Sequence, residues 1–301
     1  MADVYYIVAF VSGSAWHILP FFLVSIVLGA AVNVWDGAQQ RLQGILGTHP
    51  LKTILVASLL GTLSPFCSCG VVPVVAGMLS AGIPIAPVLA FWIASPLMDP
   101  ETFVITYAEL GWSFAIGRTI SAFGLGCIAG VIGLRFKREE HLKSVVFTPQ
   151  NEVCCGNACD ARVGKGTQFV QHVQKLSLYL GKWLLLAFVS EALIVRYIPS
   201  PWIAQLLGTE NSLAIPIAAV VGIPLYINTF SAVPIIAGLL AKGMAPGAAL
   251  TFLVAGPATS IPAMIAVTAV SKRRLFMTYV AISLLGSMVI GYLFQLSFDM
   301  L

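Results

Sequence analysis

The sequence predicts an all-α integral membrane protein built from two inverted repeats of about five helical segments each, with a broken re-entrant hairpin in each repeat. The 301 residues are 58% hydrophobic and only 9% charged, whereas roughly a quarter of residues are charged in soluble domains. Long uninterrupted apolar runs indicate helices, because barrel strands would alternate. Residues 61–96 align with residues 222–257 without a gap, at an offset of 161, and 11 of 36 positions are identical.

Apolar runs mark the expected helical segments, and several are shorter than the ~20 residues that a full span needs. Segments 53–64 and 71–80 flank Pro65–Gly70, so we expect two half-helices of a hairpin whose break is enclosed by protein or lines a cavity. The equivalent hairpin of the second repeat has its break near Asn228–Phe230. The apolar runs are 4–34, 53–64, 71–80, 84–98, 113–134, 177–198, 212–226, 232–241, 246–270 and 275–298.

The distribution of Lys and Arg favours inverted over parallel repeats. If each hairpin returns to its starting side, 12 basic residues lie in the cytoplasm and 2, Arg196 and Lys242, lie outside. Parallel repeats give a split of 8 to 6, which fits the positive-inside rule less well. The segment around Asp99, Glu101 and Glu109 contains no basic residue, and we expect it to be an external loop.

A polar segment, residues 135–176, separates the first membrane repeat (1–134) from the second (177–301). We expect it to be a cytoplasmic linker with a cysteine cluster. The three thiols are candidates for capturing a thiophilic ion and passing it to the membrane site, and a redox-exposed loop without function is the alternative. No four-ligand zinc spacing is complete in this segment. The cluster consists of Cys154, Cys155 and Cys159.

Cys67, Ser68 and Cys69 lie between Pro65 and Gly70, where the backbone is expected to be unwound. Side chains two residues apart point to the same side of an extended segment but diverge by about 200° on a helix. The two sulfurs therefore converge on one ion if the segment is extended. Thiolates select soft metals such as Cu(I), and also zinc. Cys67 and Cys69 are candidate metal and substrate ligands, and small buried hydrophobes at a tight crossing are the alternative.

Polar residues at the equivalent break of the second repeat are candidate substrate ligands facing the thiols. Asn228, Thr229 and Ser231 offer oxygen atoms or hydrogen bonds there, or they satisfy orphaned backbone groups at a half-helix end. Glu191 is the one carboxylate deep in an apolar run, which makes it a candidate for proton coupling. A structural salt bridge with Arg118 is the alternative interpretation.

The runs Ser64–Pro73 and Ser95–Glu101 resemble the signature of the predicted permease family that includes the ArsP-like organoarsenical efflux proteins and the YraQ-like permeases. A copper and zinc efflux group shares the Cys-Ser-Cys-Gly core. The resemblance covers nearly the whole chain and implies a permease whose motif cysteines, here Cys67 and Cys69, bind thiophilic cargo. Because the family spans different cargoes, the resemblance implies a permease rather than a named substrate.

Together these features predict a secondary permease, multi-pass in a prokaryotic cytoplasmic membrane, that exports a trivalent arsenical or a soft metal ion such as copper or zinc. The chain contains no Walker-type loop, so we expect that it does not hydrolyse ATP. We expect the protein not to be an enzyme and to need no cofactor. The net charge of +4 is too small and too scattered to indicate nucleic acid. The expected partners are the cargo and the lipid bilayer.

Two alternatives stay open. Two half-helix N-termini at mid-membrane suit a permease for an anionic or reduced-sulfur compound. Paired cysteines also suit a membrane thiol oxidoreductase, although Cys-x-x-Cys is the usual redox spacing. The sequence leaves open the cargo, the direction and coupling of transport, and the oligomeric state, including a homo-oligomer.

Overall fold

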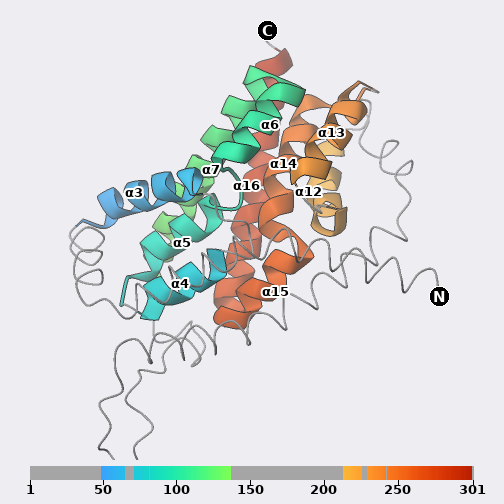
Figure 1. The fold of residues 1–301 in the computed structure, drawn as a ribbon. Coiled ribbons are helices and arrows are strands. Elements are labelled where there is room, and N and C mark those ends of the chain that lie inside the picture. The colour runs from blue at the N-terminus through green and yellow to red at the C-terminus, as the bar shows by residue number, and fades with distance from the viewer. Residues whose placement is uncertain are drawn as a thin grey trace, which may run out of the picture.

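The computed structural model describes residues 49–64, 71–80, 82–136, 213–225, 229–241 and 243–299, and every regular element in these ranges is an α-helix (Figure 1). Helices of the first half of the chain begin at prolines in two cases, because proline at the first helical position has no amide to leave unpaired. The described helices of this half are α3 (Pro50–Leu63), α4 (Val71–Ser80), α5 (Ile85–Ala94), α6 (Pro100–Leu110) and α7 (Trp112–Gly133).

The described helices of the second half follow the same order. Three of them begin 161 residues after a helix of the first half: α14 after α5, α15 after α6 and α16 after α7. The helices are α12 (Ala214–Leu225), α13 (Thr229–Leu240), α14 (Pro246–Thr259), α15 (Ile261–Val270) and α16 (Arg273–Asp299).

Two glycines 161 residues apart end equivalent helices in the same way. Gly82 follows α4 with φ 91° and Gly243 follows α13 with φ 93°, a conformation that disfavours any residue with a Cβ. Each is a C-terminal cap with two reverse-turn hydrogen bonds. The amides of Gly82 and Ile83 donate to carbonyls of α4, and those of Gly243 and Met244 donate to equivalent carbonyls of α13. The repeat in sequence is therefore also a repeat in local structure.

Each half contains a triad of packed helices with a fully buried centre. In the first half α5 packs between α3 and α7, and in the second half α14 packs between α12 and α16. Every residue of α5 is buried, and so is every residue of α14 from Gly247 to Thr259. Glycines permit this close packing: Cβ atoms added at Gly61 or Gly126 would lie 2.9 Å from neighbouring helices, and small residues are typical of helix contacts in membranes.

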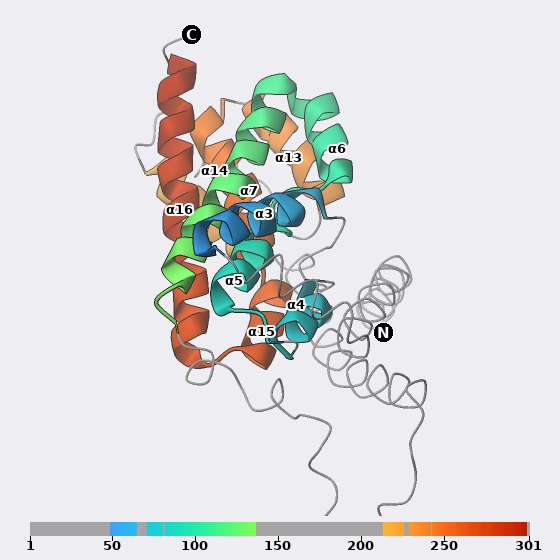
Figure 2. The same cartoon turned by 90° about the vertical axis from the view of Figure 1, so that its left-hand side faces the viewer.

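The two halves contact each other reciprocally. α13 packs against α6, and their equivalents α4 and α15 pack against each other. α7 packs against its own equivalent, α16. In Figure 1, α6 and α13 lie together at one end of the molecule and α4 and α15 lie together at the other. Figure 2 shows α16 running from the α15 end to the C-terminus at the α6 end. Equivalent helices of the two halves thus lie at opposite ends.

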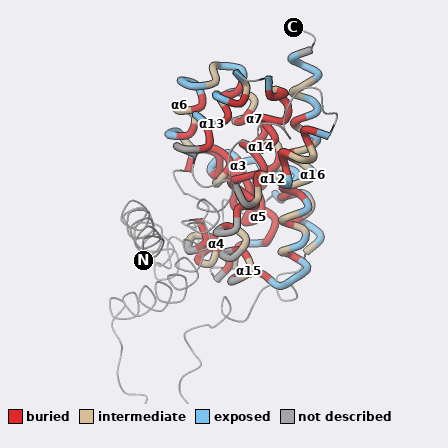
Figure 3. Tube along the Cα trace, turned by 90° about the vertical axis from the view of Figure 1, so that its right-hand side faces the viewer, coloured by how far each residue is buried: buried red, intermediate tan, exposed pale blue. Residues whose placement is uncertain are grey.

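Many exposed side chains of the described helices are large and apolar, as on a lipid-facing surface. Two helices among the described residues, Trp112–Gly133 and Arg273–Phe298, are long and apolar enough to cross a membrane. α16 is exposed along its outer side, whereas α14 beneath it is buried (Figure 3). The most exposed aliphatic side chains include Leu51, Leu55, Leu59, Leu63, Leu285, Val289, Leu293 and Leu296.

Two expectations about secondary structure were wrong. The segment with Asp99, Glu101 and Glu109 is helical (α6) rather than a loop, because Asp99 caps a helix and Pro100 begins it. The single apolar run 246–270 is divided at Ser260 into α14 and α15. Pro262, near the start of α15, cannot donate the amide hydrogen bond that a continuous helix would need.

Candidate functional site

The sequence-predicted site residues fall mainly outside the described residues. This holds for Cys67, Ser68 and Cys69, for Asn228, for Glu191 and for the linker cysteines. Thr229 and Ser231 lie in the first turn of α13, and their side chains are not described. The roles assigned to all of these residues remain predictions. The linker cysteines concerned are Cys154, Cys155 and Cys159.

The residues on either side of the Cys67–Cys69 segment are described, and they are buried. Ser64 ends α3 and is 9% exposed, while Val71 and Val72 begin α4 and are fully buried. The hydroxyl of Ser64 makes a 2.9 Å hydrogen bond with the hydroxyl of Ser95, which is itself fully buried. Both described ends of the segment are therefore buried in the protein, and its first flanking residue, Ser64, is joined to Ser95 at the end of α5.

A fully buried cation lies close to this point in the fold. Arg118 of α7 donates from Nε to the carbonyl of Leu97 at 3.0 Å and from Nη1 to Oγ1 of Thr106 at 3.2 Å. Arg118 and both acceptor residues are 0% exposed. Leu97 lies in residues 95–99 between α5 and α6. We call these residues the first break, which is distinct from the hairpin break at Pro65–Gly70. A guanidinium inside a membrane protein is costly unless it is hydrogen-bonded, so it marks a functional region by default.

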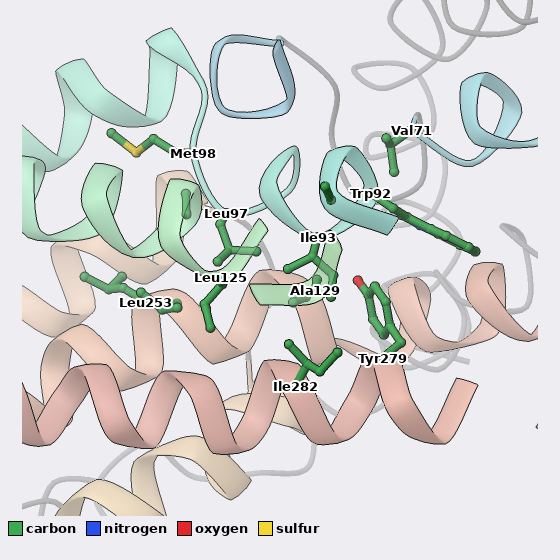
Figure 4. Packing of buried hydrophobic residues seen from close by; sticks show 14 of the residues in the cluster. Val71, Trp92, Ile93, Leu97, Met98, Leu125, Ala129, Leu253, Tyr279 and Ile282 are labelled. Carbon is green, nitrogen blue, oxygen red and sulfur yellow. The ribbon is translucent and has the colours of Figure 1, made fainter. Parts of the chain in front are cut away.

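The equivalent position in the second half holds an aromatic residue. Tyr279 of α16, 161 residues after Arg118, is 1% exposed. Its ring packs against Trp92 of α5 with centroids 5.7 Å apart, and Figure 4 shows it directed toward Trp92 beside Ile93 and Ile282. The two halves thus share a backbone but place different chemistry at this position.

The sequence reasoning missed the polar cluster formed by Ser64, Ser95, Thr106 and Arg118. The available signal was small polar residues next to Pro65 and at the end of α5, but their pairing depends on tertiary contacts. Among the described residues, no three His, Cys, Asp or Glu side chains form a group that could hold a metal ion. Cys127 of α7 is a free, partly buried thiol.

Comparison with known proteins defines the class of molecule. Residues 4–296 match the family model ArsP_1, described as a predicted permease, so the chain belongs to this family. The protein is therefore a membrane permease, a transporter rather than an enzyme. This confirms the resemblance to ArsP-like and YraQ-like permeases and argues against the thiol oxidoreductase alternative.

Curated relatives agree with this assignment. The chain is 24% identical over 280 residues to UPF0718 protein YcgR of Bacillus subtilis, covering 90% of the chain and 92% of the relative. It is 25% identical over 273 residues to UPF0718 protein YraQ of Escherichia coli, covering 89% and 75%. A putative two-component membrane permease complex subunit of Streptococcus mutans is 27% identical over 126 residues, 41% of each chain. No solved structure matches the chain.

Proposed function

We propose that this permease is a secondary transporter, multi-pass in a prokaryotic cytoplasmic membrane, built from two inverted repeats (1–134 and 177–301) joined by a linker (135–176). The observation that carries the proposal is the reciprocal packing of α6 on α13 and of α4 on α15. Reciprocal contacts between equivalent elements are the mark of a twofold relation. The opposite ends occupied by these pairs in Figures 1 and 2 support an axis in the membrane plane. Inverted repeats of this kind are typical of secondary transporters.

The cargo we propose is thiophilic: a trivalent arsenical or a soft metal ion such as copper or zinc, exported from the cell. Cys67 and Cys69 supply the soft ligands, with Ser68 between them. Asn228, Thr229 and Ser231 supply polar groups from the other repeat. The burial of Ser64, Val71 and Val72 supports an enclosed segment between α3 and α4, because irregular backbone at membrane depth must be covered by protein or line a cavity.

Serine variants of the two motif cysteines test the site. Cys67→Ser and Cys69→Ser conserve volume but are poor soft ligands, so each is expected to weaken binding of arsenite or Cu(I) at least about tenfold. Binding and vesicle transport are measured for each single variant and for the pair. Cys127→Ser is the matched control, since Cys127 is a free thiol on α7. Full transport by the double variant would contradict the proposed site.

For the linker, we propose that Cys154, Cys155 and Cys159 capture cargo before it enters the membrane. Replacing all three by serine is expected to raise the cargo concentration at half-maximal transport. The transport rate at saturating cargo is expected to stay unchanged. Complete loss of transport at saturating cargo would place these thiols in the permeation path itself.

For Glu191 we propose proton coupling, which predicts that Glu191→Gln removes the pH dependence of uptake into vesicles.

A second candidate cargo is an anionic or reduced-sulfur compound. The buried guanidinium of Arg118, hydrogen-bonded beside the first break, is the observation that favours it. Transport of arsenite and of thiosulfate into vesicles distinguishes the two candidates. Uptake of thiosulfate that arsenite does not inhibit supports the anion.

A relative named a subunit of a two-component complex supports assembly with a second chain. Mass determination in detergent tests for a homo-oligomer.

A further inference from the structure

The first break is held by hydrogen bonds that reach distant parts of the chain. Ser95 is joined to Ser64 across 31 residues, and Leu97 is joined to Arg118 across 21 residues. Arg118 also binds Thr106, on the helix that follows the break. Helices α3, α6 and α7 are therefore all joined to residues 95–97 through buried polar groups: α3 to the Ser95 hydroxyl, and α6 and α7 through Arg118 to the Leu97 carbonyl.

The second break, Ser260 between α14 and α15, is held differently. Its amide donates to the carbonyl of Gly256 at 2.8 Å, and its hydroxyl accepts from the amide of Ala263 at 3.4 Å. The neighbouring Thr259 hydroxyl donates to the carbonyl of Ala255. Within the described part of the chain, the side-chain hydrogen bonds of residues 256–260 join groups no more than four residues apart.

The side chains that bind the first break have no counterparts in the second half. At an offset of 161, the residues equivalent to Ser64 and Ser95 are Leu225 and Gly256, and Thr106 corresponds to Val267. Arg118 corresponds to Tyr279, whose ring packs against Trp92 of the other half.

The packing beside the breaks differs in the same direction. A Cβ added at Gly61 of α3 would lie 2.9 Å from the Phe91 carbonyl of α5. At the equivalent Gly222 the nearest atom would be 3.6 Å away.

We propose that Arg118 is a positioning residue that holds the first break fixed, so that the second break carries the conformational change of transport. The inference rests on the proposed two-repeat transporter. Moving the first break would separate a buried guanidinium from its acceptors, which is strongly unfavourable in a low-dielectric interior. Hydrogen bonds confined to one turn move together with that turn, so a hinge at Ser260 breaks no long-range side-chain hydrogen bond of the described residues 256–260.

Hydrogen exchange of the full chain in lipid nanodiscs tests the proposal without any cargo. We expect amides of residues 95–99 to exchange more slowly than amides of residues 260–264, which are the proposed hinge residue and the first turn of α15. Arg118→Lys keeps the charge but loses the two-pronged geometry. It is expected to speed exchange in residues 95–99 about tenfold while leaving residues 260–264 unchanged. Thr119→Val is the matched control, because Thr119 lies on the same helix and binds only the Ala115 carbonyl.

Equal exchange at the two breaks, or no change with Arg118→Lys, would overturn the proposal. If Arg118→Lys does not reach the membrane folded, Ser95→Gly provides the second test, since it installs the residue of the equivalent position and removes the bond to Ser64. In transport measurements on Arg118→Lys, a positioning role lowers the maximal rate and leaves the half-saturating cargo concentration within about twofold. A rise in that concentration would indicate contact with the cargo and contradict the proposal. Because exchange needs no cargo, an unsuitable cargo changes only the transport result.

Discussion

The two halves of this permease share a backbone plan and differ in how tightly that plan is held. Three pairs of equivalent helices, α5 with α14, α6 with α15 and α7 with α16, begin at equivalent residues. Gly82 and Gly243 end α4 and α13 with the same reverse turn. Among the described residues, by contrast, long-range side-chain hydrogen bonds hold the break after α5, and those of the break after α14 are local. Apolar faces, glycines and caps are thus sufficient to specify the helices and their packing, and polar side chains are free to differ between the halves.

The largest effect is expected where helices approach most closely. Gly130 of α7 and Gly291 of α16 are equivalent, and an added Cβ would meet Ile54 at 2.5 Å in the first case and the Gly247 carbonyl at 2.8 Å in the second. Alanine at either position is expected to lower the free energy of unfolding by about 1–3 kcal/mol, because close-packed interiors resist added volume. The cost at Gly291 is expected to be larger, since a backbone atom cannot rotate away. Thermal unfolding in detergent measures both.

Gly124→Ala is the control for this comparison, since nothing lies within 4 Å of its added Cβ. Alanine favours helix over glycine there, so no loss of stability is expected. Unchanged stability of both Gly130→Ala and Gly291→Ala would contradict equivalent close packing in the two halves.

The sequence predicted the segments with strong apolar and Gly/Pro signals and missed those without them. The runs 53–64 and 212–226 correspond to α3 and α12 within three residues at each end. α6 was missed because Glu101, Glu109 and several threonines interrupt its hydrophobicity, although Asp99 followed by Pro100 is a helix start signal. The break at Ser260 had a similar local signal in the nearby Pro262.

The candidate site was harder to predict than the fold. Spacing between Cys67 and Cys69 is local information, and it suggests ligands without showing where they lie. Ser64 pairs with Ser95, 31 residues away, and Arg118 binds Leu97 and Thr106, which are 21 and 12 residues away. Such pairings are determined by how α3, α5 and α7 pack together, which periodicity and composition do not encode.

A smaller and equal effect is expected at the two reverse turns. Gly82→Ala and Gly243→Ala place a Cβ on residues with φ 91° and 93°, which costs about 1–2 kcal/mol for an L-residue. Similar losses of thermal stability at both sites would support structural equivalence of α4 and α13. Gly238→Ala, within α13 and with open space around its Cβ, is the control. A loss at one turn only would show that the halves have diverged in this feature as well.

The smallest effect concerns the N-terminal caps of α6 and α15. The two capping residues occupy equivalent positions but make hydrogen bonds of different length. The Asp99 carboxylate accepts from the Thr102 amide at 2.6 Å, whereas the Ser260 hydroxyl accepts from the Ala263 amide at 3.4 Å. A carboxylate also interacts favourably with the helix dipole. Asp99→Ala is therefore expected to cost about 1 kcal/mol of stability, and Ser260→Ala only a few tenths. Asp99→Asn, which retains a capping oxygen, is expected to recover most of the loss in thermal unfolding measurements. An equal or larger loss for Ser260→Ala would mean that the second break is held as firmly as the first, against the hinge proposed there.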